Sequence, residues 1–313
     1  MKIKIISPGV LTTVQDLGRF GLQQYGVPVS GACDPFAAKL ANTLAGNPRD
    51  TALLECTMMG PVIEFLDPGI FAVSGAEVTP VLDGEELLVN TATRACRGQK
   101  LSFKTPKAGL RFYIAFSGGI DVPVLMGSRS TYLKTKEGGF HGRRLEAGDV
   151  LTVADAPGPG PDLSRRYGGN GFMAKAVHDI RVIPGPQDDH FTEEGLNTFL
   201  SQTYTVTASS DRMGMRLDGP VIEAKNGYDI ISDGINMGAV QVAGGKPIIM
   251  LSDRQTTGGY AKIANVISVD LHVLAQLKAG DKIRFVSVSM EEAQELYIKE
   301  AEALEGFARW LSL

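Results

Sequence analysis

The stretch Leu145-Glu-Ala-Gly-Asp149-Val-Leu-Thr-Val153 is echoed later in the chain by Leu277-Lys-Ala-Gly-Asp281-Lys-Ile-Arg-Phe285. A second pair of strings, GPVIE at 60–64 and at 219–223, occurs in the same order. Each copy reads as a turn that leads into a strand, because Gly and Asp favour turns and β-branched residues favour strands. The offsets between the copies are unequal, so the halves are related without being strict repeats. The echoes predict two similar β-domains.

Other segments predict many short strands and few helices. The strand-like segments are rich in β-branched and aromatic residues and are bounded by Gly, Pro and Asp, which favours barrels or sandwiches over βαβ units. A helix is expected after Asp34-Pro35, an N-cap followed by proline at the first helical position. A C-terminal helix is expected after Ser289, which forms a capping box with Glu292. The predicted strands are 71–74, 101–104, 112–116, 179–183, 204–208, 248–251 and 282–288.

A change in composition divides the chain near its middle. Residues 154–171 interleave Pro157, Pro159 and Pro161 with glycines, and such a segment resists both helix and sheet. The expected domains are therefore residues 1–155 and 156–313, each of an ordinary domain size.

Composition and charge restrict the class of protein. The chain of 313 residues is 43% hydrophobic and 21% charged, with a net charge of −4 and no basic block, so nucleic acid is not an expected partner. No apolar run approaches the roughly 20 residues of a membrane span, and the N-terminus reads as a first strand rather than a signal peptide. Three cysteines without CxxC spacing fit reduced thiols, so a cytoplasmic protein is expected.

Several common catalytic motifs are missing from the sequence. Gly244-Gly-Lys246 is followed by proline and lacks the hydroxyl of a phosphate-binding loop, and neither GxSxG nor HExxH occurs. The His/carboxylate cluster QDDH at 187–190 is better explained as a turn before a helix that opens near Thr192, since one turn supplies three metal ligands poorly. No metal site is expected.

Four polar segments are candidates for binding or catalysis: TTVQDLGRFG at 12–21, PVSGACD at 28–34, SSDRMG at 209–214 and DRQTTGGYAK at 253–262. The last is expected to be a loop between strands, and its paired glycines would let a ligand approach the backbone closely, although a solvated hairpin tip would look similar. The second leads into the predicted helix, whose N-terminus suits an anion. Asp211-Arg212 and Asp253-Arg254 fit either anion binding or structural ion pairs.

Taken together, these motifs resemble a known family. TTVQDLGRFG, GVPVSGACD, SDRMGMRL, SDGINMGAVQV and LSDRQTTGGYAKIANVI are similar to the biotin-dependent carboxyltransferase family, over about residues 7–288. The family includes the C subunit of 5-oxoprolinase, KipA-type antagonists of a histidine-kinase inhibitor, and the carboxyltransferase region of urea carboxylase. The resemblance implies a mainly β fold of two cyclophilin-like β-barrel domains with a few short helices. Ala261 stands where many relatives have proline, between Tyr260 and Lys262.

The resemblance also implies which residues act. The expected catalytic residues are Asp253, Arg254, Tyr260 and Lys262. The expected substrate-binding residues of the second half, which also carries the catalytic ones, are Asp211, Arg212, Gln255, Thr256, Thr257, Gly258 and Gly259. Those of the first half, which would face them across a cleft between the barrels, are Gln15, Asp16, Arg19, Ser30 and Asp34.

The implied activity is the ATP-dependent opening of 5-oxoproline to glutamate, by a complex in which this chain is the C subunit and subunits A and B are its partners. ATP is expected at the level of the complex, at a site not located in this chain, and biotin is not expected to be attached to it. Two alternatives remain open. The chain could be a KipA-type regulator that binds a subunit-B-like inhibitor, or a carboxyltransferase that uses a separate carboxybiotin carrier.

Overall fold

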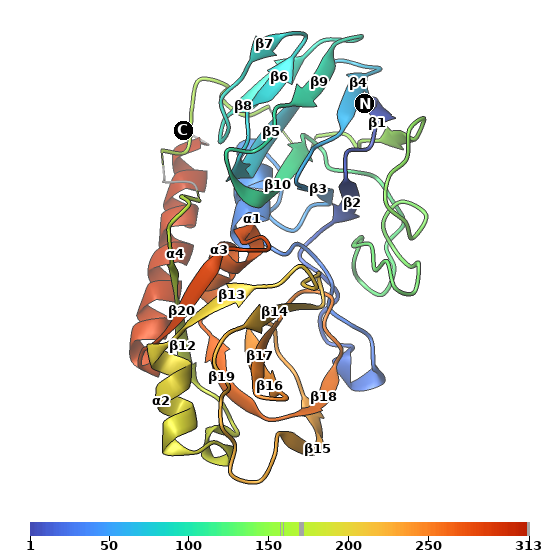
Figure 1. Ribbon diagram of the computed structural model, residues 1–313. Helices are drawn as coiled ribbons and strands as arrows, with labels where there is room; N and C mark the ends of the chain where they lie inside the picture. Colours follow the sequence, from blue (N-terminus) through green and yellow to red (C-terminus); the bar gives the residue numbers. More distant parts are fainter. Residues whose placement is uncertain (157, 159, 169–171, 312–313) are drawn as a thin grey trace. The chain divides into compact units, whose positions relative to one another are not determined.

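A computed structural model describes residues 1–156, 158, 160–168 and 172–311 of the chain (Figure 1). The fold is mainly β, as predicted, and each of the seven predicted strands overlaps an observed strand. Chain contacts define two compact units. The first comprises Met1–Arg19, Ser30–Ala174 and Glu302–Leu313, and the second comprises Phe20–Val29 and Lys175–Ala301.

The boundaries of these units differ from the single division after residue 155 that the Pro/Gly-rich stretch predicts. The described part of 154–171 belongs to the first unit, while Pro157 and Pro159 lie outside the described residues. The segment Phe20–Val29 precedes the first helix in sequence but belongs to the second unit. It includes the short 3-10 helix η1 (Gln23–Tyr25).

The first unit consists of two antiparallel sheets and a helix. Side chains of both sheets form one core, with Ile5 and Phe65 from the six-stranded sheet and Leu54 and Phe112 from the five-stranded sheet. The six-stranded sheet has the order β11 (Val150–Thr152), β1 (Lys2–Ser7), β4 (Val62–Phe65), β9 (Lys100–Phe103), β6 (Pro80–Leu82) and β7 (Glu85–Glu86). The five-stranded sheet has the order β2 (Leu11–Gln15), β3 (Leu53–Thr57), β10 (Ala108–Phe116), β5 (Gly69–Glu77) and β8 (Ala92–Ala95).

The helix α1 (Pro35–Leu44) begins where the sequence predicts. The Asp34 carboxylate accepts a hydrogen bond from the Ala37 amide at 2.9 Å, with proline at the first helical position. The apolar face of α1 packs with Leu53, Ala115 and Leu304 in a second cluster on the five-stranded sheet. This sheet is therefore buried on both faces.

The second unit contains a closed seven-stranded barrel. Parallel pairing of the strands β12 and β20 completes an otherwise antiparallel ring. The order is β12 (His178–Pro184), β19 (Lys262–Val266), β16 (Ala239–Ala243), β17 (Lys246–Met250), β14 (Gly214–Asp218), β13 (Thr203–Val206) and β20 (Lys282–Ser287). Outside the barrel, β15 (Asp229–Gly234) and β18 (Thr257–Tyr260) pair as a two-stranded ribbon.

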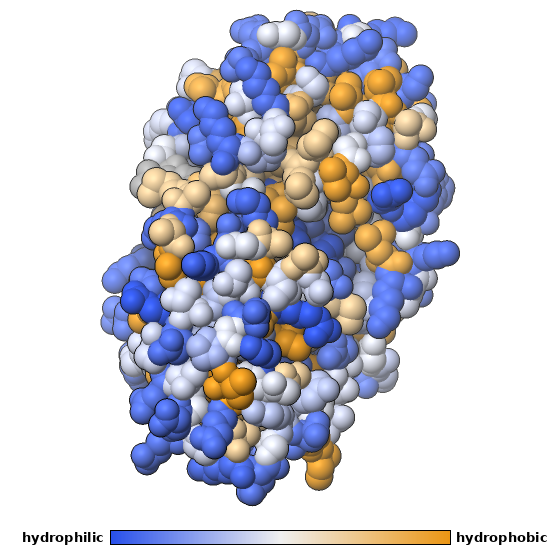
Figure 2. All heavy atoms as spheres, in the orientation of Figure 1, coloured by the Kyte–Doolittle hydropathy of each residue, from blue (hydrophilic) through white to orange (hydrophobic). Residues whose placement is uncertain are grey.

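Short helices connect the barrel strands. They are η2 (Asp188–His190), α2 (Glu193–Ser201), η3 (Ser268–Asp270) and α3 (Leu271–Gln276). The last helix of the described residues is α4 (Met290–Leu311), which at 22 residues is longer than the short helices that the resemblance implies. The Glu292 amide donates to the Ser289 hydroxyl at 3.1 Å, as expected for a capping box. Hydrophobic residues are scattered among hydrophilic ones over the face drawn in Figure 2.

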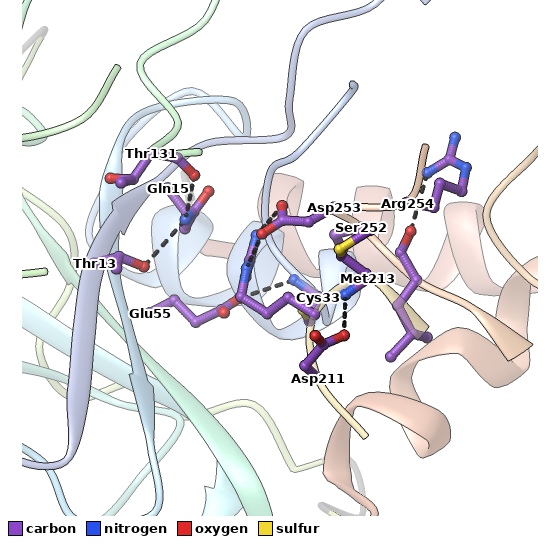
Figure 3. A network of polar contacts seen from close by, with 12 residues as sticks. Thr13, Gln15, Cys33, Glu55, Thr131, Asp211, Met213, Ser252, Asp253 and Arg254 are labelled. Carbon is purple, nitrogen blue, oxygen red and sulfur yellow. Dashed lines mark hydrogen bonds and ion pairs between the residues drawn. The ribbon is translucent and has the colours of Figure 1, made fainter. Parts of the chain in front are cut away.

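A buried polar network ties α1 to the five-stranded sheet. The Glu55 carboxylate accepts from the Tyr113 hydroxyl at 2.7 Å. It also accepts from the Cys33 amide at 2.8 Å (Figure 3). Tyr113 also accepts from the Asp34 amide at 2.8 Å. Burial and the Glu55 carboxylate hold the pKa of Tyr113 well above its ordinary value, so the phenol keeps the proton that it donates. The network fixes the polar segment 30–34 against two strands.

We predict that Tyr113→Phe lowers the free energy of unfolding by about 1–3 kcal/mol, because it leaves a buried carboxylate and a buried amide each without one partner. Urea denaturation followed by circular dichroism measures the change. Tyr25→Phe is the matched control, because Tyr25 is 73% exposed and should lose almost nothing. Equal stability of the two variants would contradict the structural role of the network.

Candidate functional site

The polar segment at the end of β2 is held by its own hydrogen bonds. The Asp16 carboxylate accepts from the Gly18 amide at 2.8 Å, from the Ser128 hydroxyl at 2.7 Å, and also from the Arg129 amide and the Ser130 hydroxyl. Arg19 is buried and donates to the Ser130 carbonyl. Both predicted binding residues therefore anchor the loop 128–130 of the first unit.

Gln15 and Ser30 each retain a polar atom without a partner. The Gln15 amide nitrogen donates to the Thr13 hydroxyl at 3.0 Å and the Thr131 carbonyl at 3.1 Å, while its buried oxygen accepts no hydrogen bond (Figure 3). Ser30 is buried at φ +56°, a left-handed conformation uncommon outside glycine, and its hydroxyl is also without a partner. Asp34 of the same segment caps α1, so its own carboxylate occupies the helix N-terminus that the sequence suggests for an anion.

The segment 253–262 is not a single loop, so this prediction is wrong. Residues 257–260 form β18, and Lys262 begins β19. A Cβ at Gly258 would lie 2.5 Å from the end of the Ile235 side chain, so a larger residue here would require Ile235 to move. Gly259 has more space, with its nearest neighbour at 3.5 Å.

One ion pair joins the two Asp-Arg dipeptides. Arg212 binds Asp253 through two hydrogen bonds, Nε to Oδ2 at 2.8 Å and Nη2 to Oδ1 at 3.0 Å, and both side chains are less than a tenth exposed. Asp211 instead accepts from the amides of Met213 and Gly214 in a turn (Figure 3). The geometry thus gives Asp211, Arg212 and Asp253 structural contacts that hold the start of the segment 253–262.

Lys262 forms an ion pair that the sequence did not indicate. Its Nζ lies 2.8 Å from Oδ2 of Asp233 on β15, and the lysine side chain is 3% exposed whereas that of Asp233 is 58% exposed. The Lys262 amide donates to the Gln187 side chain at 3.2 Å. The hydrogen bond from Lys262 is the main cause that lowers the pKa of Asp233, with a second bond from the Gly234 amide. The charged end of a buried lysine therefore reaches a solvent-exposed carboxylate.

Arg254 is buried, and its guanidinium donates hydrogen bonds only to backbone carbonyl oxygens among the described residues. Its Nε donates to the Ile235 carbonyl at 3.2 Å and its Nη1 to the Leu251 carbonyl at 3.3 Å. Burial lowers the pKa of Arg254 to about 10, against the opposing effect of nearby Asp253. The Ile235 carbonyl also accepts from the Gln23 side chain at 3.5 Å. Segment 233–235 therefore contacts both Lys262 and Arg254.

The remaining predicted residues lie on or beside the ribbon of β15 and β18. Tyr260 is 41% exposed, and its carbonyl accepts from the Gln241 side chain at 3.1 Å. Gln255 and Thr257 are exposed, and Thr256 is half-buried with its carbonyl bound to the Ile235 amide. The second unit thus places Lys262, Arg254 and an exposed polar ribbon around one short segment.

Sequence reasoning missed the partners of these residues. Asp233 lies in the quoted motif SDGINMGAVQV, but nothing local shows that its carboxylate meets Lys262. Gln23, Glu55 and Tyr113 were not singled out, because each acts through a contact distant in sequence. The Asp-Gly dipeptide at 233–234 was the one available signal of a turn or a site.

Other features lie apart from this arrangement. A groove of about 490 Å³ in the second unit is lined by residues 265–268 and by one face of α4 that includes Met290, Tyr297 and Ile298. Within the described residues, no three His, Cys, Asp or Glu side chains gather as a metal site, and the Thr192 hydroxyl caps α2 as expected. In the described part of the chain, no helix has the length and apolar character needed to cross a membrane.

Comparison with known proteins finds similarity over most of the chain. The family model "Carboxyltransferase domain, subdomain A and B" matches residues 25–287. The chain is 38% identical to the C subunit of 5-oxoprolinase from Escherichia coli, over 93% of each protein. It is 35% identical to the C subunit of 5-oxoprolinase from Haemophilus influenzae, over 98% of each.

Among solved structures, the chain is similar to the urea amidolyase of K. lactis with a TM-score of 0.91 and 32% identity. This match covers 98% of the chain but 20% of the amidolyase. It is also similar to the protein TTHA0988, with a TM-score of 0.82 and 34% identity, over 91% of the chain and 55% of that protein.

We predict that Asp253→Asn lowers the free energy of unfolding by about 3–5 kcal/mol, because it removes the counter-charge of the buried Arg212. Urea denaturation of the full chain measures the loss. Asp179→Asn is the control, since its ion pair with Arg284 is about half exposed on both sides and should contribute at most about 1 kcal/mol. If Asp253→Asn is as stable as the control variant, the pair does not hold the segment.

Proposed function

Because the chain belongs to the family of carboxyltransferase domains with subdomains A and B, we propose that it acts as the C subunit of an ATP-dependent 5-oxoprolinase. The observation that carries this proposal is the similarity to the C subunits of two 5-oxoprolinases, which in each case covers at least 93% of this chain and at least 93% of the relative. Urea amidolyase from Lachancea kluyveri is 34% identical, but that match covers only 18% of the relative.

The proposed reaction must overcome the stability of a cyclic amide. Transfer of a phosphoryl group from ATP to the ring carbonyl oxygen activates the ring carbon for attack by water. Cleavage of the C–N bond then leaves an acyl phosphate, which a second water hydrolyses to glutamate and phosphate. The phosphoryl group carries negative charge while it moves to the ring carbonyl oxygen, so a fixed cation beside that oxygen lowers the barrier to transfer.

Lys262 is the residue that we assign to this charge. Its stem is buried and its ammonium is held by Asp233 on an exposed ribbon, so the cation is fixed in position and close to solvent. Tyr260, two residues earlier, is partly exposed on the same ribbon. A positioned ammonium with donor protons left over can bind an oxygen anion without reorganising.

ATP is assigned to the complex rather than to a phosphate loop in this chain. Gly244 and Gly245 form a left-handed turn between β16 and β17, and Lys246 binds the Asp218 carboxylate at 2.9 Å and the Gly219 carbonyl. This lysine therefore serves a hairpin, and subunits A and B are the proposed partners that complete the activity.

We predict that Lys262→Met lowers 5-oxoproline-dependent ATP hydrolysis by the reconstituted complex roughly 100-fold or more, as for loss of one preorganised donor. Folding should be little affected, because Asp233 is left in contact with water. Lys246→Met is the matched control: it also begins a barrel strand and binds an aspartate, but its side chain is 40% exposed. Full activity of Lys262→Met would rule out the proposed role.

The partner proposal has its own test. We expect the chain to co-elute with subunits A and B in gel filtration at micromolar concentration, because permanent complexes bury on the order of 2,000 Å² or more. Absence of a shift with either partner would contradict a stable complex. A complex that forms but lacks activity would favour the regulatory alternative.

The structural match to urea amidolyase, which covers 98% of this chain and 20% of the amidolyase, supports a second candidate function, carboxyl transfer from a separate carboxybiotin carrier. The two functions differ in their requirements. Turnover that is abolished by avidin and requires bicarbonate would favour carboxyl transfer, whereas turnover with 5-oxoproline and ATP alone favours ring opening.

A further inference from the structure

Arg254 differs from the other buried arginine of the second unit in having no counter-charge. Arg212 faces the Asp253 carboxylate, and the half-buried Arg181 faces that of Asp270. The Arg254 guanidinium is buried as deeply as that of Arg212, but donates only to two carbonyl oxygens and forms no ion pair with a described residue. A buried cation without an anion is costly, so such sites are usually completed by a ligand or a partner.

Gln23 supplies a second donor at the same place. Its amide nitrogen reaches the Ile235 carbonyl that also accepts from Arg254 Nε, so the two side chains are neighbours. The Gln23 hydrogen bond is 3.5 Å long, at the limit of a useful interaction, and the residue is only partly buried. Its amide can therefore turn to a better acceptor at little cost.

We propose that Arg254 and Gln23 bind the carboxylate of a small monocarboxylate substrate. With the proposed function this substrate is 5-oxoproline, so the assignment rests on that proposal for the identity of the ligand. Arg254 Nη2 donates to no described residue and would bind one carboxylate oxygen, while the Gln23 amide would bind the other. Charge-assisted bonds of this kind are among the stronger polar contacts in proteins.

The local charge balance selects a monoanion. Lys262 is already paired with Asp233, and Arg212 with Asp253, so Arg254 contributes one uncompensated positive charge. A single carboxylate neutralises it, whereas a triphosphate would leave several negative charges without partners. Binding would also reverse the effect of burial that lowers the pKa of Arg254. The common contact with segment 233–235 places this anion site beside the Lys262 ion pair.

The test compares 5-oxoproline with 2-pyrrolidinone, which has the same ring but no carboxylate. In the reconstituted complex, we expect Arg254→Gln to raise KM for 5-oxoproline roughly 10- to 100-fold, as for loss of one hydrogen bond to a charged group. Gln23→Glu should raise it about 10-fold by repelling the carboxylate. KM for 2-pyrrolidinone should stay within about twofold in both variants. Arg284→Gln, an exposed position on β20, is the control that changes neither.

A binding measurement separates this proposal from the proposed function. Isothermal titration of the full chain with each lactam needs neither the A and B partners nor turnover. If the wild-type complex shows no 5-oxoproline-dependent ATP hydrolysis, the 5-oxoprolinase function fails. The carboxylate site still stands if the chain binds 5-oxoproline more tightly than 2-pyrrolidinone and Arg254→Gln removes the difference.

Two results would overturn the carboxylate site. One is equal binding of both lactams by the wild-type chain, and the other is an equal loss for both lactams in the variants. If Arg254→Gln does not fold, Gln23→Glu decides alone, because Gln23 is partly exposed and tolerates a charge. Unchanged discrimination in Gln23→Glu would then count against the proposal.

Discussion

The buried ion pair between Arg212 and Asp253 is the interaction on which the arrangement of the second unit depends. Two side-chain hydrogen bonds and a backbone bond from the Asp253 amide to the Arg212 carbonyl at 2.8 Å join two turns that are distant in sequence. Breaking such a pair leaves an uncompensated buried charge, so the pair constrains the chain strongly. It fixes where segment 253–262 begins, and with it the position of Arg254.

The charges near this pair follow from the same constraint. Both carboxylate oxygens of Asp253 bind Arg212, so Asp253 forms no direct ion pair with Arg254, its neighbour in sequence. Lys262 forms an ion pair with Asp233, which lies on an exposed ribbon. Water solvates the Asp233 carboxylate there, so its charged form carries little desolvation penalty. The buried Lys262 is thus paired with an exposed carboxylate, whereas Arg254 forms no ion pair with a described residue. This imbalance is what makes the second unit suited to a small anionic ligand.

Local signals in the sequence predicted local features well. Asp34-Pro35 and Ser289 mark the starts of α1 and α4, and runs of β-branched residues mark the strands. Features decided by distant contacts were not predictable in this way. Gly258-Gly259 reads as a loop, yet Gly258 lies in a strand because it pairs with Asp233 of β15, 25 residues earlier in the chain. The segment Phe20–Val29 belongs to the second unit although nothing in its composition says so.

The first unit shows which of its predicted residues are available for function. The carboxylates of Asp16 and Asp34 accept hydrogen bonds from nearby loops and from the start of α1, so both residues have structural roles. Ser30 differs, because a left-handed serine costs about 1–3 kcal/mol and a buried hydroxyl without a partner adds a similar amount. Strain of this kind persists only where the surrounding structure imposes it, and the next residue, Gly31, lies so close to the Leu17 backbone that a Cβ there would be 2.7 Å from the Leu17 carbonyl carbon. The Ser30 hydroxyl and the Gln15 side-chain oxygen are buried without hydrogen-bond partners, whereas the carboxylates of Asp16 and Asp34 have them. Among the predicted site residues of this unit, Ser30 and Gln15 are therefore the ones whose contacts stability alone does not explain.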